Sequence, residues 1–281
     1  MANPLQGFYR APRLYTQLPS KGKFYSDQVI DMPENGELPI FPMTSKDEMI
    51  MKNPDALLNG EAVAQVIKSC VPAVKKPREL LSNDVDALLI AMQGATNGDD
   101  IDVTGQCPKC KEEVTSVGSI ESALESMTTL EETYSFETDS GLSIEVRPFT
   151  YESSVKAGIA NFQTTRSLQN IQSINDEMEQ LKAFNTNFIQ IAALNFDLMV
   201  DSVASIKGKD AEGDDFVVTD KKSIREFMEN CDAKIGRAIE ENIAEVNKIG
   251  VEKKVLLECE KCNEQFEQEI NFDPVNFFTA S

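Results

Sequence analysis

Four of the six cysteines in this chain form two Cys-x-x-Cys pairs. Cys107 and Cys110 lie in the stretch "IDVTGQCPKCKEEV", and Cys259 and Cys262 lie in "VLLECEKCNEQFEQEI". A turn with this spacing directs two thiolates towards one point, and two such turns facing each other make a tetrahedral four-thiolate site. The sequence therefore predicts one structural Zn2+ ion held by these four cysteines, with no open position for catalysis.

The two stretches are alike beyond their cysteines. Both read C-x-K-C-x-E, so Lys109 corresponds to Lys261 and Glu112 corresponds to Glu264. Each pair resembles a zinc knuckle, a tight turn between two short strands. The flanking strands are expected at residues 101–104, 114–117, 255–258 and 266–270.

Other chemistries use thiols in similar patterns. Disulfides are disfavoured because the chain is expected in a reducing compartment, where paired CxxC motifs more often bind metal. A thioredoxin-like redox pair needs a CxxC that opens a helix after a strand, and neither pair has that setting. An iron–sulfur cluster also takes four thiolates and stays open as an alternative. Cys70 and Cys231 lie in helical patterns and are expected to be small buried side chains rather than ligands.

The elements that must position these thiols belong to an α+β fold. Four parts are predicted. Residues 1–26 form an N-terminal arm, and residues 27–100 form a small α+β body. Residues 101–118 and 251–281 form a zinc-ribbon-like module built from two distant knuckles, and residues 119–250 form a mainly helical insertion with a hairpin. Because the metal would tie the first knuckle to the second, it is expected to clamp the root of this insertion onto the body.

The body contains clear local signals. The stretch "DQVIDMPENGELPIFPMT" predicts two short strands joined by a turn at Glu34-Asn35-Gly36. Ser45 and Glu48 form a predicted capping box at the start of a helix. Further helices are expected over residues 55–70 and 83–95.

The insertion is predicted to contain a hairpin around Ser140-Gly141 and a long helical region over residues 151–206. Within that region, apolar residues recur every three or four positions, which predicts a long amphipathic helix or a helical hairpin. Packing as ordinary core is the preferred interpretation of this stripe, and docking onto another protein is the alternative. The stripe consists of Leu168, Ile171, Ile174, Met178, Leu181, Phe184, Phe188, Ile191, Leu194 and Leu198.

Charge limits the classes of partner. The formal net charge is −20, which opposes binding to nucleic-acid phosphates. The predicted arm differs from the rest of the chain because it contains no Asp or Glu. It is therefore expected to order on an acidic protein surface, with nucleic acid as the less favoured partner. Its basic and aromatic residues are Arg10, Arg13, Lys21, Lys23, Phe8, Tyr9, Tyr15, Phe24 and Tyr25.

No apolar run has the length of a membrane-spanning helix, and the first residues lack the apolar region of a secretory signal. The cytoplasm is therefore the expected compartment.

The sequence predicts a protein that is not an enzyme. It contains no histidine, and no phosphate-binding or nucleophile-elbow motif is present. The acidic residues Asp210, Glu212, Asp214 and Asp215 do not follow the calcium-loop pattern and are expected to form a solvated turn.

Several segments together resemble the T4-like bacteriophage baseplate protein family. The resemblance covers roughly residues 18–118, and the second knuckle agrees with it. The segments are "LPSKGKFY" at 18–25, "FPMTSKDEMIMKNPDALLNGEAVAQVIKSCVP" at 41–72, "DVDALLIAMQGAT" at 84–96 and "DVTGQCPKC" at 102–110.

This resemblance implies a non-enzymatic protein that assembles the central hub of a contractile tail by binding other baseplate proteins. It leaves two roles open, a structural subunit that stays in the virion and an assembly chaperone that acts in the host cytoplasm and then leaves. A zinc-ribbon nucleic-acid-binding regulatory factor is the alternative from another class, and the negative charge weighs against it. The oligomeric state is not predicted.

Overall fold

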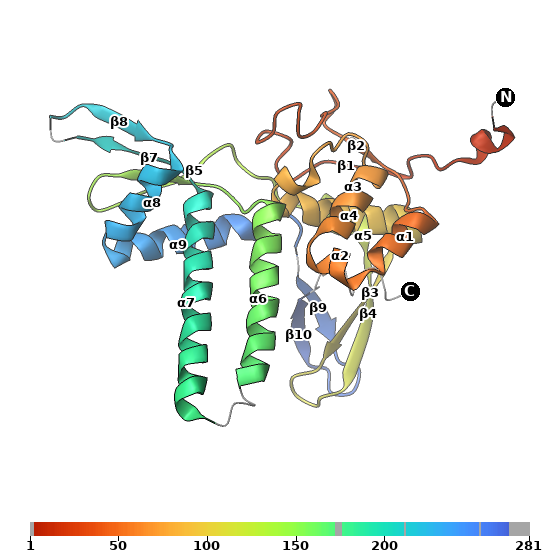
Figure 1. The fold of residues 1–281 in the computed structure, drawn as a ribbon. Helices are drawn as coiled ribbons and strands as arrows, with labels where there is room; N and C mark the ends of the chain where they lie inside the picture. The colour runs from red at the N-terminus through yellow and green to blue at the C-terminus, as the bar shows by residue number, and fades with distance from the viewer. Residues whose placement is uncertain (1–2, 172–175, 211, 253, 270–281) are drawn as a thin grey trace. The chain divides into compact units, whose positions relative to one another are not determined.

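The computed structural model describes residues 3–171, 176–210, 212–252 and 254–269. The chain divides into two compact units, the first made of residues 1–130 and 249–281 and the second of residues 131–248. Both units mix helices and strands, in agreement with the expected α+β class (Figure 1). Residues 270–281, which belong to the predicted zinc-ribbon-like module, lie outside the described residues.

The first unit is built around helix α4 (Ser82–Asn97), most of whose side chains are buried. Helices α1 (Ser45–Met51), α2 (Pro54–Leu58) and α3 (Glu61–Cys70), the short 3-10 helix η2 (Pro77–Glu79) and a two-stranded sheet complete its body. A further 3-10 helix, η1 (Pro4–Phe8), precedes them. The capping box of α1 lies one residue before the predicted one, because Thr44 accepts a hydrogen bond from the N–H of Asp47 and Asp47 accepts one from the N–H of Thr44.

The sheet corrects the predicted hairpin of residues 27–44. Strand β2 (Leu38–Ile40) pairs antiparallel with β1 (Leu14–Thr16), which comes from the predicted arm. Residues 27–32 form no such strand; Ile30 instead makes a single bridge with Val74. The turn itself is present, with Gly36 in the left-handed region at φ +74°. The local turn signal was therefore right, and the partner strand came from a more distant segment.

The structure also differs from the predicted arm over residues 14–26. Leu18 is fully buried, and the buried carboxylate of Asp84 accepts hydrogen bonds from the N–H of Ser20 at 2.9 Å and from the hydroxyl of Tyr25. These contacts attach the segment to the start of α4. Residues 3–9 carry exposed Leu5, Phe8 and Tyr9, so this shorter stretch is the part of the predicted arm that is not packed on the body.

Helix α5 (Ile120–Glu125) belongs to the first unit. Ile120 is buried against Ala87 and Ile90 of α4 and against Val251. The predicted insertion began at residue 119, whereas the division between the compact units falls after Leu130 because Ile120 buries its side chain on α4.

The second unit has a four-stranded antiparallel sheet in the order β5-β6-β7-β8. The strands are β5 (Tyr134–Glu137), β6 (Ser143–Val146), β7 (Val203–Lys209) and β8 (Asp215–Val218). The predicted hairpin around Ser140-Gly141 is confirmed as β5–β6. The helical region expected to reach residue 206 ends at Ser202 instead, because residues 203–209 pair with β6 and β8.

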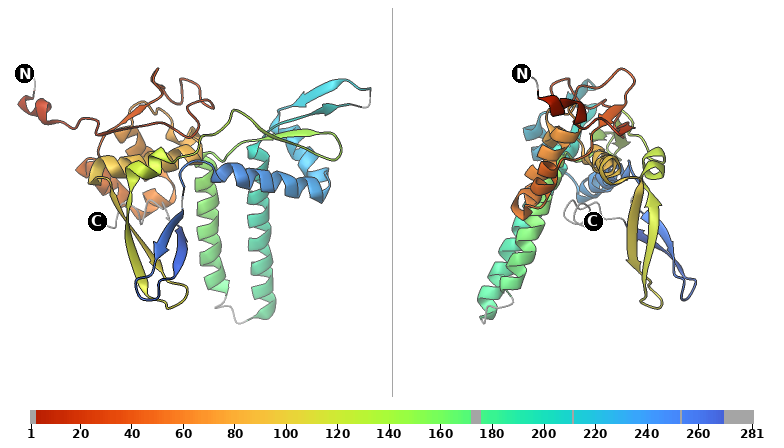
Figure 2. Two further views of the ribbon diagram at one scale, coloured as in Figure 1. Left: turned by 180° about the vertical axis from the view of Figure 1, so that it is seen from behind. Right: turned by 90° about the vertical axis from the view of Figure 1, so that its right-hand side faces the viewer.

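Helices α8 (Lys221–Asn230) and α9 (Ala233–Lys248) pack against this sheet and form the core of the second unit. Their buried residues include Ile224, Ile239 and Ile243, which contact sheet residues such as Ile144 and Val203. Helices α6 (Tyr151–Ile171) and α7 (Glu177–Ser202) contact each other as an antiparallel pair, as the left view of Figure 2 shows. The predicted helical hairpin is thus confirmed.

Candidate metal centre

The two Cys-x-x-Cys turns lie at the tips of two β-hairpins of the first unit. Strand β3 (Asp100–Gln106) pairs with β4 (Glu113–Ser119), and β9 (Lys254–Glu258) pairs with β10 (Gln265–Glu269). The two hairpins lie side by side although the whole second unit separates them in sequence (Figure 1). The strands expected on both sides of each knuckle are therefore present.

The tips bring all four thiols of the two pairs together. Cys107 Sγ lies 3.6 Å from Cys262 Sγ, Cys110 Sγ lies 3.5 Å from Cys259 Sγ, and Cys262 Sγ lies 3.6 Å from Cys110 Sγ. All four ligand atoms lie within 4.8 Å of one another, and none of the four cysteines is in a disulfide. Cys107 and Cys259 are completely buried, whereas Cys110 and Cys262 are partly exposed.

Both turns have the same backbone geometry. In the first, the N–H of Lys111 donates to the carbonyl of Cys107 at 3.0 Å, and Lys111 has a φ of +62°. In the second, the N–H of Asn263 donates to the carbonyl of Cys259 at 2.8 Å, and Asn263 has a φ of +53°. A residue in the left-handed region lets each chain reverse directly after its second cysteine.

The remaining matched residues join one knuckle to the other. Lys109 Nζ lies 3.1 Å from a carboxylate oxygen of Glu264, and Lys261 Nζ lies 2.6 Å from one of Glu112. The shared C-x-K-C-x-E pattern thus makes two reciprocal ion pairs around the sulfurs. The sequence showed the matching Lys and Glu residues, and their pairing becomes visible only when the two tips face each other.

Apolar side chains of both hairpins pack next to the four thiols. Val103, Val114 and Leu257 form one buried cluster with Cys107 and Cys259. Gly105 allows the close approach of the hairpins, since a Cβ there would lie 2.9 Å from Leu257 Cδ1 and even closer to the side chain of Gln268. A side chain at position 105 would require the ends of the Leu257 and Gln268 side chains to move.

The electrostatics of the four thiols favour a bound cation. The backbone N–H groups of Cys110 and Lys109 stabilise the thiolate of Cys107 and lower its pKa to about 7. The N–H of Glu264 has the same effect on Cys262, but lost hydration and the adjacent thiols outweigh it and raise the pKa of Cys262 to about 12. Four sulfurs in contact cannot all be ionised unless a positive ion lies among them.

The distances fit a tetrahedral metal site. Zn–S bonds of about 2.3 Å give sulfur–sulfur edges of about 3.8 Å, close to the separations of 3.5 and 3.6 Å found here. In the part of the chain that the structure describes, no carboxylate joins this group. The four cysteines could therefore hold a metal ion through sulfur alone.

The other two cysteines lie elsewhere. Cys70 is buried in α3, where burial raises the pKa of its thiol to about 11, and its Sγ lies 3.8 Å from Arg10. Cys231 is partly exposed at the end of α8. Neither belongs to a group of possible metal ligands among the described residues.

A second group of possible ligands consists of exposed carboxylates. Asp210, Glu212 and Asp214 lie together in the turn between β7 and β8. Asp210 Oδ1 accepts hydrogen bonds from the N–H groups of Glu212 and Asp214 at 2.9 and 3.0 Å, so this carboxylate stabilises the backbone of the turn. The arrangement is the solvated turn that the sequence predicted.

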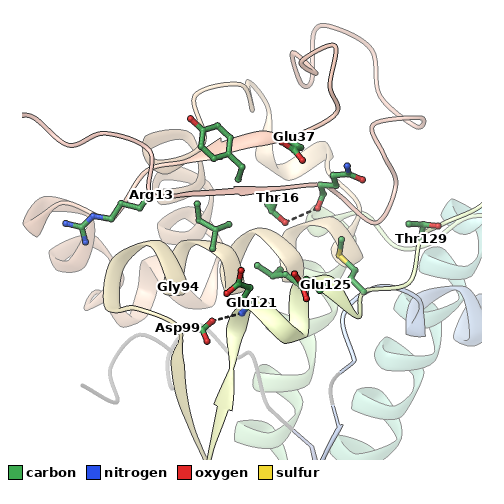
Figure 3. Close-up of a pocket in the computed structure, with 13 residues that line it drawn as sticks. Arg13, Thr16, Glu37, Gly94, Asp99, Glu121, Glu125 and Thr129 are labelled. Atoms are coloured by element: carbon green, nitrogen blue, oxygen red, sulfur yellow. Dashed lines mark hydrogen bonds between the residues drawn. The ribbon is translucent and has the colours of Figure 1, made fainter.

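A groove of about 660 Å3 lies between β1 and α5 in the first unit (Figure 3). Its acidic residues include Glu121 and Glu125, both exposed on α5. Asp99 accepts the N–H of Glu121 at 2.6 Å and so stabilises the start of that helix. The groove thus combines surface carboxylates with a hydrogen bond at the start of a helix.

The family comparison covers nearly all of this architecture. A family model described as T4 bacteriophage base plate protein matches residues 14–279, including both knuckles and the entire second unit. The chain belongs to this family of baseplate proteins. The resemblance predicted over residues 18–118 is thereby shown, and it extends across the middle of the chain.

Membership indicates a structural or assembly role in the phage baseplate, in association with the virion tail and with other tail or baseplate proteins. No match to this chain was found among curated proteins, and none was found among solved structures. None of the helices within the described residues combines the length and the apolar character needed to cross a membrane.

Proposed function

We propose that this baseplate protein assembles the central hub of a contractile tail by binding other baseplate proteins, and that it catalyses no reaction. The observation that carries the proposal is the family match over residues 14–279. The net charge of −20 further supports protein partners over nucleic acid, since phosphate binding requires segregated basic surface.

Two experiments together test this role and separate its two forms. Mass spectrometry of purified mature virions shows whether the protein stays in the tail, and pull-downs from infected lysate show which tail proteins bind it. Presence in virions supports a structural subunit. Absence from virions together with recovery of hub proteins supports an assembly chaperone. Absence from virions without recovery of any hub protein would contradict both forms.

We also propose that the metal is one structural Zn2+ ion, held by Cys107, Cys110, Cys259 and Cys262. A set of four thiolates at tetrahedral separations suits zinc, and a site closed by four protein ligands has no position for substrate. Elemental analysis of protein purified under reducing conditions should find one zinc per chain. Iron in its place would support the iron–sulfur alternative, and absence of metal would contradict the site.

The proposed ion would join two hairpins on either side of the second unit in sequence. The chain leaves the first unit after Leu130 and returns before Ile249. Four metal–sulfur bonds would therefore hold residues 100–119 and 254–269 together within the first unit. Because structural zinc contributes its binding energy to folding, the first unit is expected to lose stability without it.

The nucleic-acid alternative has a direct test. A zinc-ribbon factor that binds DNA would show affinity that falls steeply with salt, because its basic residues would release counterions from phosphates. We expect no such binding at physiological ionic strength, since the net charge of −20 repels a polyanion.

A further inference from the structure

Helix α7 has large apolar side chains that helix α6 does not fully cover. Six large apolar side chains of the α6–α7 pair are exposed by about half or more of their surface, and we call this set the hairpin apolar face. Its members are Phe162 (49%), Met178 (63%), Leu181 (55%), Phe184 (49%), Phe188 (65%) and Ile189 (66%). The predicted stripe is therefore not simply core. Its members Leu168, Ile171 and Ile174 lie outside the described side chains.

The α7 residues turned away from solvent over the same stretch are small or polar. Ala183 and Asn187 are half-buried, and Asn187 Nδ2 donates to Ser167 Oγ of α6 at 2.7 Å. Closer to the sheet, Ile191 and Leu194 are half-buried and Leu198 is buried. The far half of the helix pair thus leaves about half or more of the surface of the largest apolar side chains of α7 in solvent.

The spacing on α7 indicates what shape of partner fits. Leu181, Phe184, Phe188 and Ile191 follow one another at intervals of three, four and three residues. This alternation is that of helices packed in coiled coils and four-helix bundles. The occupant of the hairpin apolar face is therefore expected to be helical.

Charge favours a second copy of this chain as the occupant. The segments 157–167 and 180–196 contain only Arg166 and Lys182 as charged residues, although 26% of the whole chain is charged. A two-fold symmetric contact sets one face against the same face, so a strongly charged face would repel itself. Apart from Met178, which lies between Glu177 and Glu179, the members of the hairpin apolar face avoid this repulsion and show the charge depletion typical of interface cores.

The exposed area is sufficient for such a contact. The six side chains present roughly 700 Å2 per copy if each aromatic or large aliphatic residue has about 200 Å2 in full. A stable protein interface of standard size buries about 800 Å2 per partner. The polar residues between these side chains would supply the remainder.

We propose that two copies of this protein associate through the α6–α7 helix pairs, forming a symmetric four-helix bundle with Leu181, Phe184 and Phe188 at its centre. The proposal does not depend on the metal or on the tail role. The apolar side chains that each copy exposes would become the bundle core, and the body of each chain would keep its negative charge in solvent.

Sedimentation velocity of the full chain, measured from about 1 to 100 µM, tests the proposal because standard interfaces give dissociation constants from micromolar downwards. We expect a dimer for the wild type. The double variant Leu181→Glu/Phe188→Glu should raise the dimer dissociation constant at least about 100-fold, since symmetry places its like charges against one another. At concentrations below the wild-type dissociation constant, where both proteins are monomers, its thermal melt should stay close to that of the wild type.

A matched control uses the side of α7 opposite Leu181, Phe184 and Phe188, the proposed bundle centre, and Thr186 there lies three residues from the peripheral member Ile189. Thr186 and Gln190 are exposed and lie two residues before and after Phe188, which is about 200° around the helix. The variant Thr186→Glu/Gln190→Glu has the same added charge and should remain dimeric.

Three results would overturn the proposal. One is a wild-type monomer throughout the concentration range, which is decisive even if the double variant fails to fold. Another is a dimer that the Leu181→Glu/Phe188→Glu variant does not weaken more than the control. The third is a monomer whose hairpin apolar face instead binds a different tail protein.

Discussion

Thr128 and Gly250 join the two chain segments of the first unit at the point where the second unit is inserted. The N–H of Thr128 donates to the carbonyl of Gly250 at 2.9 Å, and the N–H of Gly250 donates to Thr128 Oγ1 at 2.9 Å. The Thr128 hydroxyl also lies 3.1 Å from the carbonyl of Gly250. The outgoing and returning chains are thus held together directly, in addition to the four-cysteine centre at the hairpin tips.

Replacing Thr128 with Val should lower the free energy of unfolding of the first unit by about 1–2 kcal/mol. The change removes the acceptor of the Gly250 N–H, and a partly buried donor without a partner is costly. Chemical denaturation with a probe in the first unit would measure it. Thr115→Val is the control, because the hydroxyl of Thr115 contacts that of Thr104 at an exposed position, and it should change stability by less than about 0.5 kcal/mol.

Replacing Cys110 or Cys259 with Ser should abolish metal binding and destabilise the first unit by several kcal/mol. Three thiolates bind zinc more weakly than four, and metal binding is coupled to folding. Elemental analysis and thermal melts before and after addition of a chelator would measure both effects. Cys231→Ser should keep the metal, since Cys231 lies outside the four-cysteine group. A variant at Cys110 that keeps a full equivalent of zinc would contradict the ligand assignment.

The double variant Lys109→Met/Lys261→Met should lower zinc affinity by about 10-fold, at the lower end of the range for residues that contact metal ligands. Each ammonium group pairs with a carboxylate of the opposite knuckle and lies near the sulfurs, so its loss removes positive charge beside four thiolates. Competition with a chromophoric chelator would measure the affinity. The stability of the metal-free protein should change little, because both pairs are exposed to solvent. Lys254→Met, which breaks a pair with Glu267 away from the sulfurs, should leave affinity unchanged.

Asp84 should make the first unit more stable as the pH falls. Burial raises the pKa of this carboxyl in the folded protein above its ordinary value of 3.8, although Ser20 and Tyr25 donate hydrogen bonds to it. At a pH between the unfolded pKa and the folded pKa, the folded state binds more protons at Asp84 than the unfolded state does. The protonated carboxyl therefore makes its whole contribution to stability below pH 3.8, and this contribution is lost as the pH rises through the folded pKa.

The variant Asp84→Asn isolates this effect, because an amide can still accept from Ser20 without carrying a charge. The difference in unfolding free energy between wild type and variant should shift in favour of the variant as the pH rises from about 4. Urea denaturation of both proteins over this pH range would measure it. A difference that is constant with pH would show that Asp84 does not titrate differently in the two states.

Two truncations distinguish the exposed N-terminal stretch from the packed segment that follows it. Removing residues 1–9 should change the thermal melt little, because Leu5, Phe8 and Tyr9 are exposed. Removing residues 1–26 deletes β1, the buried Leu18 and the hydrogen bonds to Asp84, and should unfold the first unit. Equal melts for both truncations would contradict the packing of residues 14–25.

Local features of this protein were determined by its sequence. Each Cys-x-x-Cys turn is complete within a few residues, and its strands follow from alternating β-prone side chains on both sides. The hairpin around Gly141 and the start of α1 likewise depend on turn and capping residues that act on their immediate neighbours. Helices α6 (Tyr151–Ile171) and α7 (Glu177–Ser202) could be predicted because the apolar period repeats over many turns.

The tertiary structure decided which distant segments meet. Strand β2 pairs with β1 rather than with residues 27–32, since a short strand carries no information about its partner beyond its alternation. The apolar period of α7 is the same whether a side chain is covered or exposed, so it could not show that Leu198 is buried while Phe188 is in solvent. The four-thiol group and the reciprocal Lys109–Glu264 and Lys261–Glu112 pairs form only because the fold brings together two hairpins that the inserted unit separates in sequence.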